Sequence, residues 1–197
     1  MNTQSTIYIA GHQGLVGSAI LQELLAAGHA PETILTRTHA ELDLTNQAAV
    51  QAFFAAEKPA QVYLAAAKAG GIHANSTYPA DLIYQNLMIQ GNLMEAAYQN
   101  GVQKLMFFAP SADTLPLDAL ALSDDSYAFA KTAGIKLCEE YASRDDADYR
   151  YILLPVLSGH GVQQHDGSHV DGIAAASINV MNLPKASYSQ RKPHVLN

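Results

Sequence analysis

Apolar residues along the first 155 positions follow two alternating spacings. Short runs rich in β-branched and aromatic residues are typical of strands and lie at residues 6–10, 33–36, 61–66, 104–109 and 149–154. Between them, apolar residues recur three and four positions apart, which predicts helices at residues 16–27, 46–57, 79–100 and 126–143. This alternation predicts an α/β fold, with a doubly wound parallel sheet.

The pattern changes after Pro155. Residues 158–168 are rich in Gly, His and Gln and lack periodic apolar positions, which predicts a loop. A further apolar helix is expected at residues 170–182, followed by a polar tail that contains a short strand at residues 194–196. We therefore expect a main domain over residues 1–157 and a small lobe over residues 158–197 packed on it.

Composition agrees with a globular protein and excludes several classes. The chain has 197 residues, of which 49% are hydrophobic and 15% charged, so it can bury a core and is not disordered. Cys138 has no possible disulfide partner, which points to a reducing compartment. The net charge of -7 disfavours a nucleic-acid partner or an anionic membrane surface.

No targeting or membrane segment is expected. The first apolar run, residues 7–10, is too short for a signal peptide, and no long uncharged apolar stretch follows it. We therefore expect a cytoplasmic protein whose partners are small molecules and other subunits.

A glycine-rich loop follows the first predicted strand. Gly11, Gly14 and Gly17 have the spacing GxxGxxG between a strand and a helix, a variant of the dinucleotide-binding fingerprint of Rossmann-type folds. The N–H groups of the helix start, at Leu15 and Val16, would then bind phosphate. The alternative is that these residues are ordinary turn glycines.

Two further segments are expected at the cofactor. Arg37 ends the second strand, and no acid occurs there before Glu41, so the 2′-phosphate of NADP is favoured over the 2′-hydroxyl of NAD. Alternatively, Arg37 points to solvent. The third strand ends in Ala65, Ala66 and Ala67, which we expect to be buried on both faces and to line the cofactor site.

Tyr127 and Lys131 stand four residues apart and so share one face of a predicted helix. This helix follows the fourth strand, at the edge where open α/β sheets bind ligands. A nearby ammonium lowers the pKa of a phenol, so Tyr127 could exchange a proton with a carbonyl oxygen while Lys131 also bonds the nicotinamide ribose. Alternatively, Tyr127 belongs to the core edge and Lys131 to a solvated helix face.

Four longer segments resemble the GDP-L-fucose synthases, a family of extended short-chain dehydrogenases/reductases. They read IAGHQGLVGSAI, RTHAELDLT, VYLAAAKAGGIHANSTYPADLIYQN and YAFAKTAGIKLCEEY. The resemblance implies an NADP(H)-dependent enzyme that epimerises and reduces a GDP-4-keto sugar. It assigns the phosphate loop to the three glycines, the 2′-phosphate to Arg37, and catalysis to Tyr127 and Lys131. It further implies a homodimer that pairs helices 79–100 and 126–143.

The chain departs from that family at several positions. Gln13 stands where the family has a second arginine, and Pro110 and Ala112 stand where it has a catalytic Ser and Cys. Ser111, displaced by one position, is then the candidate for binding the substrate carbonyl. Several dozen residues of the family's nucleotide-sugar region are absent before residues 167–181, and the chain stops at Asn197.

These departures leave alternatives open. The protein could be a catalytically inactive or altered dinucleotide-binding homologue, or a reductase of a smaller carbonyl compound. A metal centre is not expected, because the spacing of the nearby acidic and imidazole groups fits no standard site. Those groups are His160, His165, Asp166 and His169.

Overall fold

The computed structural model describes residues 5–69, 77–110, 125–144, 146–154, 167–189 and 194–195. The strands are β1 (Ile7–Ala10), β2 (Ile34–Arg37), β3 (Gln61–Leu64), β4 (Lys104–Pro110), β5 (Asp148–Leu154) and β6 (His194–Val195). The helices are α1 (Leu15–Ala26), α2 (Gln47–Glu57), α4 (Pro79–Gln99), α5 (Ser126–Ala142), α6 (Gly167–Asn182) and α7 (Lys185–Ser189), and a 3-10 turn, η1 (Pro31–Thr33), precedes β2.

The strands form one parallel sheet in the order β2-β1-β3-β4-β5-β6. The chain runs outward in opposite directions from the pair β1 and β3, so the strand order reverses between these two strands. In open α/β sheets a ligand binds at such a reversal, outside the carboxyl ends of the strands. The fold is therefore the predicted Rossmann-type, doubly wound α/β sheet.

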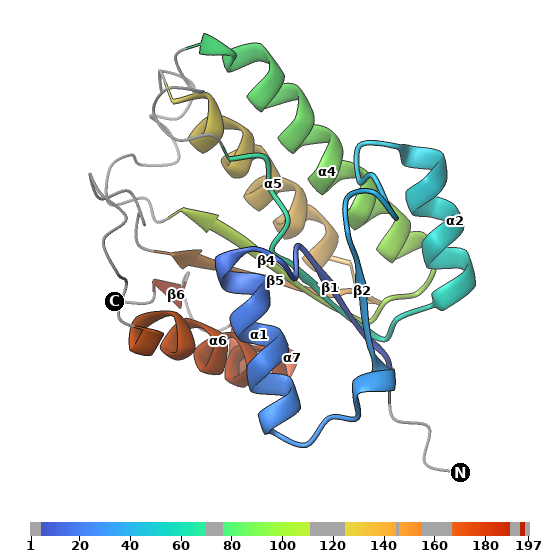
Figure 1. Ribbon diagram of the computed structural model, residues 1–197, viewed down its shortest axis with the longest axis vertical. Helices are drawn as coiled ribbons and strands as arrows, with labels where there is room; N and C mark the ends of the chain where they lie inside the picture. Colours follow the sequence, from blue (N-terminus) through green and yellow to red (C-terminus); the bar gives the residue numbers. More distant parts are fainter. Residues whose placement is uncertain are drawn as a thin grey trace.

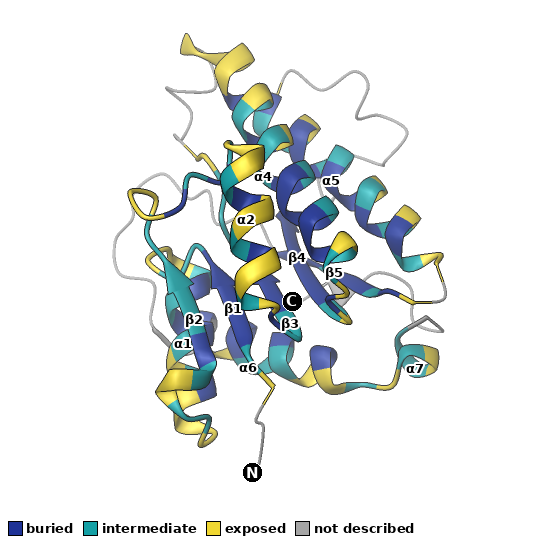
Figure 2. Cartoon of the chain, turned by 90° about the vertical axis from the view of Figure 1, so that its right-hand side faces the viewer, coloured by how far each residue is buried: buried dark blue, intermediate teal, exposed yellow. Residues whose placement is uncertain are grey.

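Helices cover both faces of the sheet. Helices α1 and α6 pack on one face, whereas α2, α4 and α5 pack on the other (Figure 1). Alternate residues of β1 serve the two layers: Tyr8 and Ala10 join the core under α2, α4 and α5, while Ile7 and Ile9 join the core under α1 and α6. The sheet is accordingly buried throughout its centre (Figure 2).

A buried arginine ties α6 and the residues after it to the sheet. Arg150, on β5, is fully buried and pairs with Asp148 at 2.5 Å. Its guanidinium also donates to the carbonyl oxygens of Val180 and, at 2.7 Å, of Leu183. The end of α6 thereby packs on the same sheet as the rest of the described chain.

The strands and helices expected from the periodicity are confirmed, with ends that differ by at most three residues. One prediction is wrong: β3 ends at Leu64, so Ala65, Ala66 and Ala67 lie beyond it and are half-buried. The sequence also gave no sign of η1 or α7, which are too short to have a period. The loop expected at residues 158–168 lies mostly outside the described residues. No described helix is long and apolar enough to cross a membrane.

Candidate active site

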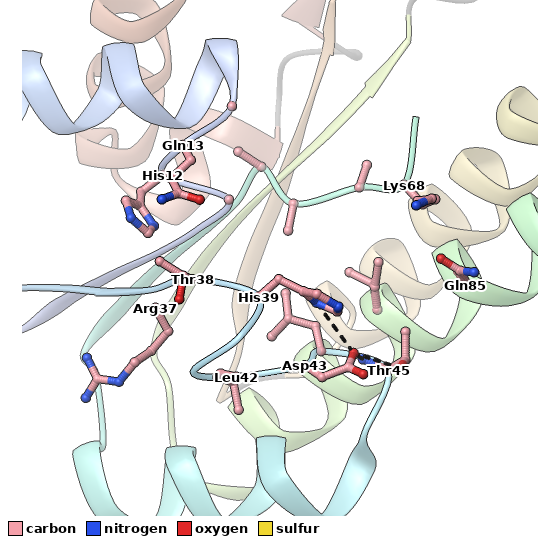
Figure 3. Close-up of a pocket in the computed structure, with 17 residues that line it drawn as sticks. His12, Gln13, Arg37, Thr38, His39, Leu42, Asp43, Thr45, Lys68 and Gln85 are labelled. Atoms are coloured by element: carbon pink, nitrogen blue, oxygen red, sulfur yellow. Dashed lines mark hydrogen bonds and ion pairs between the residues drawn. The ribbon is translucent and has the colours of Figure 1, made fainter. Parts of the chain in front are cut away.

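A cavity of about 330 Å³ lies at the carboxyl ends of β1, β2 and β3, where the strand order reverses. Its walls come from residues 11–14, 37–39, 42–45 and 65–68, together with Gln85 and Ile89 of α4. Each loop segment follows one of the three strands, so the parallel sheet brings them to one edge (Figure 3). The cavity is therefore the ligand site that the topology predicts.

The glycine loop is shaped by close backbone contacts. Gly11 has a φ of 86°, and a Cβ on it would lie 2.6 Å from the backbone nitrogen of Ala66. A Cβ on Gly17 would collide with the Gly11 carbonyl oxygen, so α1 can start this close to β1 only without a side chain there. The first-turn N–H groups of Leu15, Val16 and Gly17 thus begin beside the cavity and lack intrahelical acceptors.

These features fit a dinucleotide. The N-terminus of α1 has Gly14 as its N-cap, so no side chain caps the helix, and its first turn contains no acidic residue. A bound anion would therefore encounter neither a competing side-chain cap nor a negative charge. The Nδ1 atom of His12 is buried in the cavity wall and bonds to no group of the described chain. A polar ligand in the cavity would give that nitrogen a partner.

Arg37, expected to bind the 2′-phosphate, lies in the cavity wall but faces α2. Its Nη2 donates to Glu57 at 2.7 Å, its Nη1 donates to the Thr36 carbonyl oxygen at 2.8 Å, and its guanidinium lies over the Phe53 ring. Figure 3 shows the side chain directed away from His12. Its role with a cofactor stays a prediction.

Glu41, the first acid after β2 in the sequence, is hydrogen-bonded within its own loop. Glu41 accepts hydrogen bonds from the backbone N–H of Thr38 at 2.7 Å and from its hydroxyl at 2.8 Å, and these bonds hold the Glu41 pKa below its usual range. Asp43, next along the loop, accepts from Thr45 and lies 3.9 Å from His39. Glu41 thus caps a turn, and its carboxylate is not placed like the ribose-binding acid of NAD sites.

Two buried amides of α4 hold the loops that line the cavity. Asn86 accepts from the N–H of Lys68 at 3.0 Å and donates to the Lys68 carbonyl oxygen at 2.9 Å, which fixes the wall that follows β3. Asn92 donates to the carbonyl oxygens of Leu44 and Thr45, both at 3.0 Å, which fixes the wall that precedes α2. The cavity therefore depends on α4 for its shape.

Tyr127 and Lys131 share a face of α5, which follows β4 as predicted. Asp125 starts this helix by accepting from the N–H groups of Tyr127 and Ala128. Lys131 is 3% exposed, and its Nζ lies 4.4 Å from the ring centre of Phe107 on β4. Lys131 is therefore packed against β4, although neither its side chain nor that of Tyr127 lines the cavity described above.

The expected lowering of the Tyr127 pKa is wrong for this geometry. Burial, with a smaller effect from the Asp125 carboxylate, raises the Tyr127 pKa to about 12. Burial also lowers the Lys131 pKa to about 7, and its Nζ is 6.0 Å from the centre of the Tyr127 ring. Burial therefore outweighs the attraction between ammonium and phenolate.

The structure thus brings together most of the residues expected at the cofactor. Gly11, Gly14, Arg37 and residues 65–67 line one cavity. Leu15 is exposed and Val16 half-buried at the start of α1. Ser111 and Ala112 lie outside the described residues, as do His160, His165 and Asp166. Within the described part of the chain, no group of three His, Cys, Asp or Glu side chains could hold a metal ion.

Sequence comparison identifies the family. The profile of the NAD dependent epimerase/dehydratase family matches residues 7–191. The chain belongs to this family. The chain is 40% identical to GDP-L-fucose synthase of Escherichia coli (strain K12) over 228 positions, which cover 92% of the chain and 70% of that relative. Because 228 positions exceed the length of the chain, the relative contains internal residues that this chain lacks.

Two further relatives agree. GDP-L-fucose synthase 1 of Arabidopsis thaliana is 50% identical over 177 residues, covering 83% of this chain. The structure of a GDP-D-glycero-L-gluco-heptose synthase from Campylobacter jejuni, solved in the presence of NADPH, is 33% identical, superposes with a TM-score of 0.71 and covers 86% of this chain. The chain spans 54% of the length of each of these two proteins.

Several residues that shape the site were missed by motif analysis. Glu57, Asn86 and Asn92 belong to no cofactor motif, yet they bond Arg37 and the cavity loops. One signal was present in the sequence: the amides at positions 86, 90 and 92 stand among apolar residues of the helix. In the structure those amides are buried.

Proposed function

We propose that this protein binds NADP(H) in the cavity at the ends of β1, β2 and β3, and reduces a nucleotide-sugar ketone in the manner of the GDP-L-fucose synthases. One observation carries the proposal: the glycine cradle follows β1 and the helix with Tyr127 and Lys131 follows β4, two strands of one parallel sheet that only β3 separates, so both begin at the same edge of the sheet. The relatives named for GDP-sugar synthesis, one of them solved with NADPH, support the substrate class and the cofactor.

In the reducing direction, bound NADPH supplies a hydride to the carbonyl carbon of the substrate. Tyr127 would donate its phenolic proton to the carbonyl oxygen, so that the π bond of the carbonyl is replaced by a new C–H and a new O–H bond, the C–O single bond remains, and Tyr127 is left as a phenolate. A pKa of about 12 keeps Tyr127 protonated at neutral pH, ready for this donation. When protonated, Lys131 would provide a positive charge near the phenolate that remains and a donor for the nicotinamide ribose; its pKa of about 7 leaves it partly protonated at neutral pH.

Ser111 is the proposed ligand of the substrate carbonyl, since Pro110 at the end of β4 has neither a hydroxyl nor an N–H to offer. Epimerisation needs a further acid and base beside the substrate carbonyl. Ala112, in the place of the family's cysteine, cannot supply one. Reduction is therefore the step that the residues support best, and epimerisation belongs to the proposal only through the resemblance.

A homodimer is also part of the proposal. Helices α4 and α5 pack side by side, and both carry exposed large apolar side chains: Tyr84 and Leu87 on α4 are 62% and 37% exposed, and Phe129 on α5 is 39% exposed. Large apolar groups on one solvent-facing surface favour association with a second copy. Sedimentation of the protein at several concentrations tests this, because a monomer throughout would contradict it.

The proposal also includes a division into domains and a cellular location. Residues 1–157 form the cofactor domain, and residues 158–197 form a lobe on the same sheet, as the bonds from Arg150 to the end of α6 support. A cytoplasmic location is supported by the single cysteine, Cys138, whose thiol is buried and free.

Calorimetric titration with NADPH and NADH, each with and without GDP-mannose as a probe, tests the function. We expect NADPH to bind more tightly than NADH and GDP-mannose to bind the NADPH-loaded protein. Oxidation of NADPH, followed at its nicotinamide absorbance with a GDP-4-keto sugar as substrate, then tests reduction. Binding of NADPH without any GDP-sugar binding would indicate a smaller carbonyl substrate, and binding of neither cofactor would reject the proposal.

A further inference from the structure

A third buried amide of α4 bonds to the helix that carries Tyr127 and Lys131. Gln90 is 3% exposed, and its Nε2 donates to the backbone carbonyl oxygen of Ala130 at 2.7 Å. Ala130 immediately precedes Lys131, and its carbonyl lies in the turn that links the two side chains. A single side chain of α4 thus holds the functional turn of α5.

The sequence of α5 makes room for this amide. A Cβ on Gly134 would lie 2.5 Å from Gln90 Oε1 and 2.6 Å from Phe107 Cζ. Glycine inside a helix costs about 1 kcal/mol relative to alanine. The close approach of α5 to Gln90 is therefore maintained at a local cost in helix stability.

The same contact includes the aromatic ring that supports the lysine. The ring of Phe107, on β4, reaches Gly134, and Lys131 Nζ lies 4.4 Å from its ring centre. Gln90, Gly134, Phe107 and Lys131 accordingly form one packed unit, which we call the α4–α5 clamp. Any shift of Gln90 is transmitted to the position of α5 over the end of β4.

The hydrogen bond also explains why an amide is buried there. Gln90 Oε1 has no hydrogen-bond partner in the described chain, so the side chain keeps its Nε2 bond while leaving an acceptor unsatisfied. A buried, half-satisfied amide destabilises a core relative to an apolar group of the same shape. Packing alone would therefore favour methionine or leucine, whereas a required bond to Ala130 favours glutamine.

We propose that Gln90 is a positioning residue: through the Ala130 carbonyl oxygen, it fixes the first turns of α5 so that Tyr127 and Lys131 face the cofactor site. Gln90 does not line the cavity, so it acts through α5. The proposal rests on the proposed function for its kinetic consequence. Its structural consequence, a first half of α5 that is held by Gln90, is independent of activity.

Gln90→Met tests the proposal, because methionine fills a similar volume and removes the donor. Gln99→Met is the control, because it makes the same change on the same helix. Within the described residues, the Gln99 side chain bonds Glu95 of its own helix and not the turn of α5 that carries Tyr127 and Lys131. We expect Gln90→Met to lower kcat about 10- to 100-fold, because small displacements of catalytic groups cost that much. The Kd for NADPH should stay within about threefold of wild type, and Gln99→Met should match wild type in both.

Hydrogen exchange of the backbone amides gives the readout that needs no turnover. In Gln90→Met we expect amides of the first half of α5 to exchange about fivefold faster or more, while those of its second half keep the wild-type rate. Unchanged exchange in the first half would overturn the proposal even if the protein had no enzymatic activity. Uniformly faster exchange over α4 and α5 would also overturn it, since that pattern reports general destabilisation.

The kinetic result separates this inference from the proposed function. A wild-type protein that neither binds NADPH nor reduces a ketone would reject the proposed function and leave the exchange experiment to decide on Gln90. If wild type is active, an unchanged kcat in Gln90→Met would reject the positioning role. A fall in kcat that only follows the unfolded fraction, measured from the melting curve, would reject it as well.

Discussion

The guanidinium of Arg37 lies 2.7 Å from the carboxylate of Glu57, and this ion pair joins the end of β2 to the end of α2. Both side chains are about one-third exposed, so the pair sits at the rim of the cavity and not within the core. Arg37 is also stacked over Phe53, which limits its freedom to turn. The proposed cation for the 2′-phosphate is therefore held and neutralised by an acid.

Glu57→Gln should consequently tighten NADPH binding. Removing the negative charge leaves Arg37 near the cavity with an uncompensated positive charge, which attracts the 2′-phosphate. We expect the Kd for NADPH to fall about three- to tenfold, with little change for NADH, which has no 2′-phosphate. Calorimetric titration with both cofactors measures the two constants.

Arg37→Ala tests the same role directly, and Glu140→Gln is the control for the loss of an acidic charge. Arg37→Ala should weaken NADPH about tenfold or more and NADH much less. Glu140 is an exposed acid on α5 that pairs with Lys136, so Glu140→Gln should leave both constants unchanged. Equal effects of Glu57→Gln on NADPH and NADH would show that Arg37 does not bind the 2′-phosphate.

Tyr127→Phe should abolish reduction without loss of cofactor binding. The change removes only the hydroxyl, so we expect kcat to fall about 100-fold or more while the Kd for NADPH stays near the wild-type value. Because its pKa is raised to about 12, Tyr127 keeps its proton between about pH 6 and 9. Loss of that proton should therefore not slow reduction by wild type in this range. The reverse oxidation, which needs the phenolate, should accelerate over the same range. Wild-type turnover by Tyr127→Phe would remove the residue from catalysis.

The sequence predicted the fold well because its signals are local. Each strand and helix around the sheet has its own apolar period, and the turns between them are marked by glycine or by polar residues. The glycine loop was predicted for the same reason, since its three glycines and the strand before it are contiguous. Short elements such as α7, with five residues, have no period and were missed.

The rest of the site depends on contacts between distant positions. The bonds from Asn86 to Lys68, Gln90 to Ala130 and Asn92 to Leu44 join residues 18 to 48 positions apart. Whether such a bond forms depends on how α4 is rotated against its neighbours, which no spacing in the sequence specifies. The pKa of Tyr127 was mispredicted for a related reason, because burial depends on the whole fold.

Asn86→Ala should loosen the cavity wall that follows β3. Within the described residues, Asn86 makes three hydrogen bonds, two to the backbone of Lys68 and one to the carbonyl oxygen of Leu82. Its removal leaves the backbone groups of Lys68 without these partners, so we expect the Kd for NADPH to rise about tenfold and the free energy of unfolding to fall by about 2 kcal/mol. Titration and urea unfolding measure the two effects.

Asn100→Ala provides the control, because Asn100 is the C-cap of the same helix and, within the described residues, its side chain bonds the Ala96 carbonyl oxygen of its own last turn and no cavity loop. It should lower stability by about 1 kcal/mol or less and leave the Kd for NADPH unchanged. If Asn86→Ala were destabilised yet bound NADPH like wild type, the loop it holds would not contribute to the cofactor site.

Lys131→Met should stabilise the protein, and the gain should depend on pH. Burial lowers the Lys131 pKa to about 7 in the folded state, whereas an unfolded lysine has a pKa of about 10.4. Between these values the unfolded state binds a proton that the folded state does not, so this residue makes the free energy of unfolding rise with pH. At about pH 7 and below, the folded state carries the full cost of a buried charge. Replacement by methionine removes that cost, so we expect a gain of about 1 kcal/mol or more near pH 7 that shrinks toward pH 10.

Urea unfolding at about pH 6.5, 8 and 9.5 measures this dependence. Lys136→Met is the control, since Lys136 is exposed on the same helix and pairs with Glu140 at 2.8 Å; its replacement should change the free energy of unfolding by about 0.5 kcal/mol or less. A gain for Lys131→Met that is equal at all three pH values would mean that better packing, and not removal of a buried charge, is responsible. Loss of stability near pH 7 would mean that the ammonium is paired in solution, and the placement of Lys131 against Phe107 would then be wrong.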